Sequence, residues 1–369
     1  MMKIIKKEFS HIILEGSSYE VGRQQAELIK NNPAWIRFIK SAKSKFSDKE
    51  FEQVEIFFEK VCPGLNDELK GMADYFDIPV KNMSFYYHSY LRPYCSTFCV
   101  LPQKSTDGHV YVCRNYDFNY KVEDYRLCTT KISGKFSHTG FSTMLFGRND
   151  GLNDQGLCVT MSSTGMGVGA TKWLRPPALC GSQFWLILRG VLENCQDVTE
   201  AIAYTRNIDI AYNINLLMTD KKGNACLLET FDGQKATARL DHKPFLGSTN
   251  HALIPEIKKW AGKSMKHSVI RYRAIEKLFR LKGKLSLEDL QRFCSQKYPD
   301  GIAVLYYRKF LGTTYSIIFD LTDGKAYIAF GSPNINPWKV VELNNPEKAV
   351  YPCTFIEEVP PKDFMEWID

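Results

Sequence analysis

The sequence lacks the long charged and apolar runs that mark nucleic-acid-binding tails and membrane spans. Its 48 basic and 41 acidic residues leave a net charge of +7, but the two signs are interspersed and no block of five like charges occurs. Nucleic-acid binding therefore has little support. No stretch approaches the roughly 18 apolar residues of a membrane span. We expect neither a nucleic acid nor a membrane as partner, and whether the chain forms a homo-oligomer stays open.

The cysteines lack the spacings that mark disulfide frameworks and zinc sites. There are 11 of them, an odd number without regular intervals, and no CxxC motif occurs. The first residues also lack the long apolar core of a secretory signal. These features favour free thiols, a cytoplasmic location and the absence of a metal ion.

Two regions of the 369-residue chain differ in pattern. Residues 1–94 read as a strand over 12–16 followed by helices, because Ser17 with Glu20 and Ser47 with Glu50 have the spacing of capping boxes. Beyond residue 94, short β-rich runs dominate and are separated by turn dipeptides such as Asp107-Gly108, Asp232-Gly233 and Asp323-Gly324. Helical patterns separate these groups, over 184–194, 198–205, 269–281 and 286–296. Hairpins with intervening helices indicate an α+β fold of antiparallel sheets covered by helices.

Cys95 is the most informative residue of the second region. It opens an apolar run over 95–101, the chain turns at 106–108, and a second run over 109–113 ends at Arg114. Asp117 follows three residues later. A hairpin of this length brings a guanidinium and a carboxylate back beside a thiol.

This hairpin contains the parts of an N-terminal nucleophile. A thiol has a reference pKa of about 8.5 and an α-amine of about 8, so one N-terminal cysteine supplies both nucleophile and base. Arg114 favours the thiolate, and Asp117 can hold the α-ammonium in place. The same thiol can attack the Tyr94 carbonyl in the intact chain, and hydrolysis of that thioester frees the amine. The division is then 1–94, a propeptide or light chain, and 95–369, the catalytic domain.

Several short motifs in chain order resemble those of the linear-amide carbon–nitrogen hydrolases. This family includes choloylglycine hydrolase, penicillin V acylase and the acyl-CoA:isopenicillin N acyltransferase group. The chain resembles the acyltransferase branch most. The motifs span almost the whole chain: 16–23, Cys95-Ser96-Thr97-Phe98, 107–108, Arg114-Asn115-Tyr116-Asp117, 151–157, Thr249-Asn250-His251, 313–316 and 331–333.

The resemblance implies a fold, a reaction and further site residues. It implies a four-layer αββα sandwich that cleaves a linear amide of a small N-acyl substrate without a cofactor. Asn250 corresponds to the donor that polarises the oxyanion, and Ser162 or Ser163 to a second donor. A further family arginine corresponds to Arg271, with Arg273 as the competing position.

Three alternatives stay open at this point. An acyltransferase would pass the acyl group from the Cys95 thioester to an amine in place of water. An unprocessed relative would bind acyl amides without catalysis. A conventional cysteine hydrolase would use His251 as the base, although the residues around Cys95 do not resemble a papain-type signature.

Overall fold

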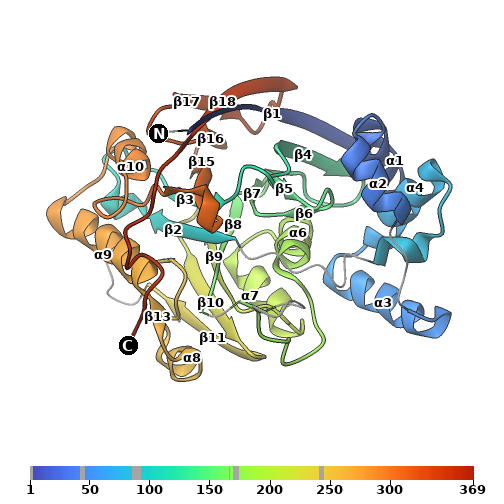
Figure 1. The fold of residues 1–369 in the computed structure, drawn as a ribbon, viewed down its shortest axis with the longest axis horizontal. Coiled ribbons are helices and arrows are strands. Elements are labelled where there is room, and N and C mark those ends of the chain that lie inside the picture. Colours follow the sequence, from blue (N-terminus) through green and yellow to red (C-terminus); the bar gives the residue numbers. More distant parts are fainter. Residues whose placement is uncertain (1–2, 42–45, 85–92, 166, 169–173, 241–244) are drawn as a thin grey trace.

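The computed structural model describes residues 3–41, 46–84, 93–165, 167–168, 174–240 and 245–369 (Figure 1). Within them, two β-sheets lie face to face and helices cover their outer surfaces. Within these ranges, no helix is long and apolar enough to cross a membrane.

The larger sheet has ten strands and takes one strand from near each end of the chain. Its order is β11-β10-β9-β8-β7-β5-β4-β1-β18, with β6 paired to β5. The bounds are β1 Lys3–Gly16, β4 Arg126–Ile132, β5 His138–Thr143, β6 Gly147–Arg148, β7 Asp150–Asn153, β8 Leu157–Ser163, β9 Ile214–Asp220, β10 Ala225–Phe231, β11 Gln234–Arg239 and β18 Ala349–Glu357. Every pair in this sheet is antiparallel except β1 with β4, which is parallel.

The smaller sheet has seven strands and holds the predicted hairpin. Its order is β12-β2-β3-β15-β16-β17, with β14 paired to β15. The bounds are β2 Tyr94–Val100, β3 Tyr111–Phe118, β12 Gly247–Ser248, β14 Leu305–Tyr306, β15 Leu311–Asp320, β16 Lys325–Phe330 and β17 Trp338–Glu342. A separate two-stranded ribbon pairs β13 Ser264–Met265 with β19 Trp367–Ile368.

The helices complete the four-layer sandwich that the resemblance implies. α6 Phe184–Asn194 and α7 Val198–Arg206 pack on the larger sheet, whereas α9 Lys266–Leu281 and α10 Leu287–Ser295 pack on the smaller one. α8 Pro255–Ala261 packs on β10 and β11. Strand β2 contacts β8 and β9 across the interior. There Phe141 of the larger sheet and Tyr315 of the smaller sheet stack with ring centroids 3.6 Å apart, and this contact helps to hold the two sheets together. The predicted α+β, αββα class is confirmed.

The N-terminal region is helical, as predicted, but its strand is longer than the sequence indicated. The helices α1 Ser18–Ile29, α2 Pro33–Ser41, α3 Asp48–Val61 and α4 Leu65–Phe76 gather at one end of the molecule (Figure 1). Both predicted capping boxes are present, at Ser17 with Glu20 and at Ser47 with Glu50. β1 begins at Lys3 rather than near residue 12, and it lies between β4 and β18. This region therefore contributes an interior strand of the larger sheet as well as outer helices.

Candidate active site

The β2–β3 hairpin brings Cys95 and Arg114 together, as the sequence predicts. In its antiparallel register Cys95 faces Tyr116 and Thr97 faces Arg114. Diagonal neighbours of this kind lie on one face of a sheet. Here that face points into the sandwich, and Arg114 Nη2 donates a hydrogen bond to the Cys95 sulfur over 3.1 Å. We call it the inner face of the hairpin.

Arg114 is held by partners that the sequence did not reveal. Its Nη1 donates to the carboxylate of Asp150 and, over 3.1 Å, to the Tyr315 hydroxyl, while Nη2 also donates to the Met161 carbonyl. Arg114 and Asp150 are fully buried. In the sequence, only the position of Asp150 directly before the 151–157 motif could have marked it as a site residue. These partners fix the guanidinium beside the sulfur.

The Cys95 thiol is fully buried and stays protonated at neutral pH. Burial raises its pKa to about 11, although the Arg114 charge acts in the opposite direction. The thiol therefore needs a base before it becomes a good nucleophile.

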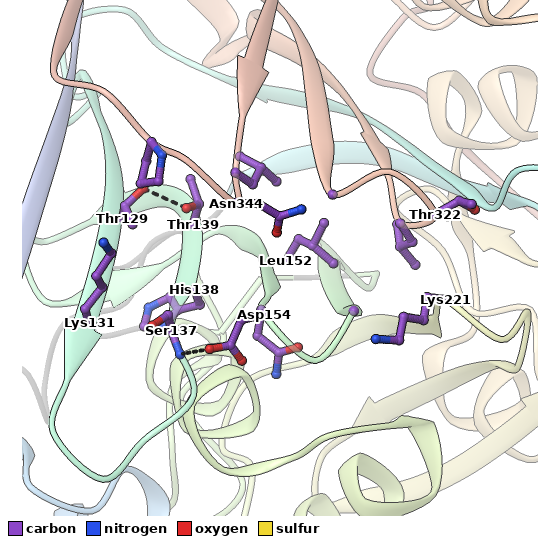
Figure 2. Close-up of a pocket in the computed structure, with 16 residues that line it drawn as sticks. Thr129, Lys131, Ser137, His138, Thr139, Leu152, Asp154, Lys221, Thr322 and Asn344 are labelled. Atoms are coloured by element: carbon purple, nitrogen blue, oxygen red, sulfur yellow. Dashed lines mark hydrogen bonds between the residues drawn. The ribbon is translucent and has the colours of Figure 1, made fainter.

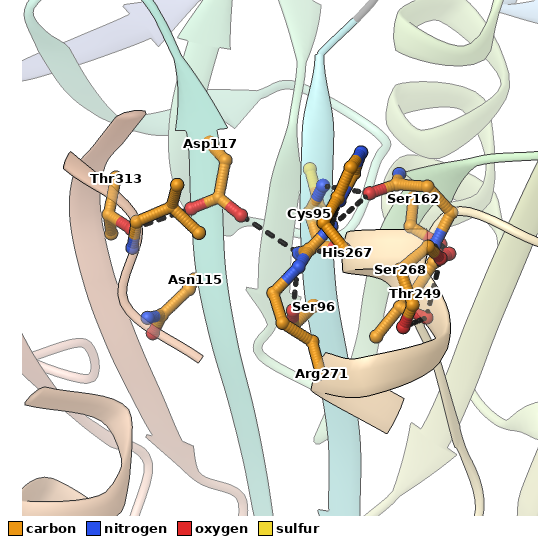
Figure 3. A network of polar contacts seen from close by, with 12 residues as sticks. Cys95, Ser96, Asn115, Asp117, Ser162, Thr249, His267, Ser268, Arg271 and Thr313 are labelled. Carbon is orange, nitrogen blue, oxygen red and sulfur yellow. Dashed lines mark hydrogen bonds and ion pairs between the residues drawn. The ribbon is translucent and has the colours of Figure 1, made fainter. Parts of the chain in front are cut away.

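Arg271 contacts Cys95 from the opposite side of the hairpin, which we call the outer face. It extends from α9, and Figure 3 shows its guanidinium between Asp117 and Cys95. Its Nη1 donates to the Cys95 carbonyl at 3.1 Å, the Ser96 hydroxyl at 2.7 Å and Asp117 Oδ2 at 3.0 Å. Arg271 is buried, whereas the competing Arg273 is exposed. Of these two positions, Arg271 is the one that reaches Cys95.

Asp117 lies on this outer face because it alternates with Tyr116 along β3, and a β-bulge in the neighbouring strand β15 brings Thr313 beside it. The register between β3 and β15 shifts at Thr314, so that Thr313 faces Asp117 and Tyr315 faces Tyr116. The bulge sends Thr313 to the outer face, where its hydroxyl donates to Asp117 over 2.6 Å, and Tyr315 to the inner face. Burial raises the pKa of Asp117 to about 7, and the nearby Arg271 charge opposes that rise.

Asn250 contacts the backbone of Cys95 through its side-chain oxygen. Its Oδ1 accepts hydrogen bonds from the Cys95 N–H at 3.3 Å and from Arg271 Nη2 at 2.7 Å. Its Nδ2 donates to the carbonyl and hydroxyl oxygens of Ser163, at 3.0 and 3.1 Å. The role of Asn250 as an oxyanion donor stays a prediction.

The two candidate serines differ in what they contact. Ser163 donates from its hydroxyl to the Pro93 carbonyl over 2.8 Å, close to the Tyr94–Cys95 bond. The Ser162 hydroxyl contacts the hydroxyl of Ser248 and the carbonyl of Thr249 instead. Ser163 is therefore the serine in contact with the segment that precedes Cys95.

Two histidines lie near this network, but only one was considered from the sequence. His251 Nδ1 contacts the hydroxyls of Thr249 and Ser268, and burial lowers its pKa to about 4. His267 contacts Arg271 Nη2 over 3.0 Å and stacks on Phe364, with ring centroids 4.7 Å apart. The sequence could have predicted this contact, because His267 lies four residues before Arg271 on α9 and helical residues four apart share a face.

In the described part of the chain, one group of side chains lies close enough together to share a metal ion. It consists of His109, Asp320 and Asp323 at the far end of the hairpin. Asp320 already accepts hydrogen bonds from the backbone N–H groups of Thr322 and Asp323, so it caps this turn. This group therefore has a structural role apart from Cys95.

A pocket of about 210 Å³ lies beside the inner face. Tyr116, which faces Cys95 in the hairpin register and packs against the Arg114 guanidinium, forms one of its walls. Phe118 and Met144 line it as well, and Trp35 comes from α2 in the N-terminal region. A mainly aromatic and aliphatic lining suits an apolar group.

Several solved structures are similar to this chain. Among solved structures, the chain is similar to a point mutant of conjugated bile acid hydrolase from Clostridium perfringens (14% identity, 69% of this chain and 96% of that one, TM-score 0.43). It is also similar to penicillin V acylase from Agrobacterium tumefaciens (14%, 68% and 87%, TM-score 0.45) and to the Caenorhabditis elegans ortholog of N-acylethanolamine-hydrolyzing acid amidase (17%, 62% and 93%, TM-score 0.43). No curated protein sequence matches it.

The decisive comparison is with the model of one family, which matches residues 103–335. The match begins after β2 and therefore does not include Cys95. Because these residues make up more than half of the 369-residue sequence, the chain belongs to the acyl-coenzyme A:6-aminopenicillanic acid acyl-transferase family.

Proposed function

We propose that this protein is an N-terminal-nucleophile amidohydrolase that cleaves its own Tyr94–Cys95 bond and then uses Cys95 to hydrolyse a linear amide. One observation carries the proposal: three polar atoms of Cys95 each have a buried, specific partner. The sulfur accepts from Arg114, the backbone nitrogen donates to Asn250, and the carbonyl oxygen accepts from Arg271. A cysteine that served only as core packing would not need these contacts.

Self-cleavage begins with attack of the Cys95 sulfur on the Tyr94 carbonyl carbon. The C–N bond breaks, the nitrogen gains the thiol proton, and Tyr94 is left as a thioester on the sulfur. Water then hydrolyses the thioester, which leaves a carboxylate at Tyr94 and returns the thiol to Cys95, whose amine is already free. Asn250 Oδ1, which accepts the Cys95 N–H in the uncut chain, is positioned to accept from the α-ammonium afterwards.

The same groups support the reaction with substrate. The α-amine takes the thiol proton, the sulfur attacks the amide carbonyl, and the α-ammonium protonates the leaving amine. Water activated by the α-amine then releases the acyl group as an acid. Ser163, which binds the Pro93 carbonyl before cleavage, is placed to donate to the substrate once that carbonyl has moved away.

The pocket beside Tyr116 supports an N-acyl substrate with an apolar acyl group. It adjoins the residue that faces Cys95, and its volume of about 210 Å³ suits a short chain or single ring. Because Trp35 belongs to its wall, residues 1–94 complete the site as a retained light chain.

Buried contacts support retention of this light chain. β1 pairs with β4 and β18, and Glu68 of α4 forms a buried ion pair with Arg189 of α6. Removing residues 1–94 would open two sheet edges and leave Arg189 with one fewer counter-charge. We expect both fragments to co-elute in size-exclusion chromatography after scission, and their separation would argue for a released propeptide instead.

The second candidate function is acyl transfer from Cys95 to an amine, which the name of the matched family favours. Mass spectrometry of products from a panel of N-acyl substrates, with and without an added amine, separates the two reactions. Hydrolysis gives the free acid under both conditions, whereas transfer gives a new amide only when the amine is present.

Matched cysteine variants test whether the chemistry belongs to Cys95. Cys95→Ala should abolish both scission and turnover, while Cys99→Ala, four residues along the same buried strand, should retain them. Activity in a folded Cys95→Ala variant would refute the proposal.

A further inference from the structure

A second cavity, of about 300 Å³, lies at the opposite end of the sandwich from Cys95. Its walls come from the larger sheet and from the turn after β15, which includes Leu321 and Thr322. The same β15 strand carries Tyr315 beside Arg114. At roughly 3.3 Å per residue, six residues of strand place the cavity about 20 Å from that contact. The cavity is therefore separate from the proposed active site.

The lining of this cavity is polar and carries more positive than negative charge. Figure 2 shows Lys131 and Lys221 on opposite sides, with the Lys221 amine directed toward the interior. Asp154 is the one carboxylate in the lining, and it accepts hydrogen bonds from the Ser137 N–H and the Gln155 side chain. Burial and the Arg148 charge keep the pKa of His138 well below its usual range, so His138 adds no charge. The lining thus holds two positive charges, on Lys131 and Lys221, and one negative charge, on Asp154.

Two glycines allow the side chains at the rim to approach closely. Gly156 has a φ of +88°, and a Cβ there would lie 2.5 Å from the Lys221 side chain. Gly324 has a φ of +66°, and its Cβ would lie 2.4 Å from the Asn344 amide nitrogen. Both distances are too short for real atoms, so each glycine is needed for its neighbour to occupy this position. The two glycines therefore leave room at the rim for the Lys221 and Asn344 side chains.

From this arrangement we propose that the cavity binds a small hydroxylated anion, either a phosphate ester or a sugar-acid carboxylate. Lys221, whose amine is directed toward the interior, contacts the anionic group, and Lys131 adds positive charge on the opposite side of the cavity. Thr139 and Asn344 offer hydrogen bonds to ligand hydroxyls, and Leu152 and Leu321 contact its carbon atoms. The volume is at the lower end of the range for small-molecule sites, which suits a ligand of this size.

Isothermal titration calorimetry of the full chain with glycerol 3-phosphate, gluconate and neutral glycerol tests the proposal. At least one of the two anions should bind more tightly than glycerol. The anion that binds more tightly shows whether the cavity prefers a phosphate ester or a carboxylate. Lys221→Gln should weaken that binding by about fivefold, and Lys131→Gln should weaken it by less. Lys222→Gln, an exposed neighbour outside the lining, should leave it unchanged.

A pair of glycine variants tests whether the position of the Lys221 side chain matters for binding. Gly156→Ala and Gly223→Ala both place a side chain at a left-handed φ, but the added methyl at 223 meets no atom closer than 3.4 Å. Only Gly156→Ala should weaken binding as Lys221→Gln does. If Gly156→Ala does not fold, the lysine variants and their Lys222→Gln control decide the matter.

Two results would overturn this inference: anions that bind no better than glycerol, or anion binding that is unchanged in both Lys131→Gln and Lys221→Gln. Because the cavity does not contain Cys95, the Cys95→Ala variant should bind the anion as the wild type does. The inference and the proposed function can therefore fail independently.

Discussion

The inner and outer faces of the β2–β3 hairpin hold the same cysteine by different atoms. On the inner face Arg114, 19 residues further along the chain, contacts the sulfur. On the outer face Arg271, 176 residues further along, contacts the carbonyl oxygen. The positive charge beside the Cys95 sulfur thus comes from the same hairpin, whereas a helix distant in sequence holds the backbone of Cys95. Thiol reactivity and bond positioning should therefore be separable by mutation.

Replacing each arginine by methionine should give the largest effects. Either change leaves a buried acidic side chain, Asp150 or Asp117, without its cation. Loss of the Arg114–Asp150 pair should lower the free energy of unfolding by about 3–5 kcal/mol, and loss of the Arg271–Asp117 pair should lower it by less below pH 7, where Asp117 holds a proton. Their effects on scission should differ, because Arg114 is the group that lowers the pKa of the Cys95 thiol most. Arg114→Met should move the pH midpoint of the scission rate upward, and Arg271→Met should slow scission at every pH.

Time courses of intact mass between about pH 6 and pH 9 measure both quantities, with folding of each variant checked by circular dichroism. If both variants shifted the pH midpoint equally, it would be wrong that Arg114 sets the thiol pKa while Arg271 only positions the backbone of Cys95.

A matched pair of serine variants sharpens the comparison at the bond itself. Ser163→Ala removes the donor that positions the Pro93 carbonyl next to the scissile bond, so the scission rate should fall, but by less than the roughly 10²-fold cost of removing a donor to the oxyanion itself. Ser162→Ala removes a hydroxyl that contacts Ser248 and Thr249 and should change the rate far less. Rates from gel densitometry decide between them, and equal rates for the two variants would exclude Ser163 from the site.

Asp117 should make the outer face sensitive to pH. Its folded-state pKa of about 7 exceeds the ordinary 3.8, so between these values the folded chain holds a proton that the unfolded chain has released. The free energy of unfolding therefore falls as pH rises through this window, by about 1.4 kcal/mol per pH unit from this group.

Asp117→Asn should remove this contribution, so its stability relative to Asp117 should increase from pH 4 to pH 7. Urea titrations in a Cys95→Ala background, which keeps the chain uncut, measure the difference. A difference that stays constant with pH would mean that Asp117 ionises near its ordinary pKa.

The smallest effect is expected for His251. Its Nδ1 contacts Thr249 and Ser268 rather than Cys95, and burial favours its neutral form. His251→Ala should leave kcat within about threefold of wild type, since the α-amine of Cys95 is the proposed base. A loss of several orders of magnitude would instead favour a conventional thiol–histidine pair.

The residues that sequence reasoning found are those linked by short chain distances or by a recognisable motif. Arg114 follows from the hairpin that starts at Cys95, and Asn250 and Arg271 follow from the family resemblance. Asp150 was missed because its contact with Arg114 depends on how the two sheets stack. The opposite placement of Thr313 and Tyr315 was missed because a bulge reverses the alternation of strand side chains.

The extent of β1 was also beyond the sequence pattern. Its first half, with Lys6, Lys7 and Glu8, is polar and mostly exposed, so it lacks the apolar signature of an interior strand. It becomes a strand because β18, from the other end of the chain, pairs with residues 3–11. Pairing over such a distance in sequence leaves no local signal.

Intact-mass analysis and N-terminal sequencing of purified, active protein test the central claim most directly. The account predicts two chains that stay associated, one of which begins at Cys95. Active protein that remains a single chain with Tyr94 bonded to Cys95 would contradict it, because Cys95 would then have no α-amine to act as the base.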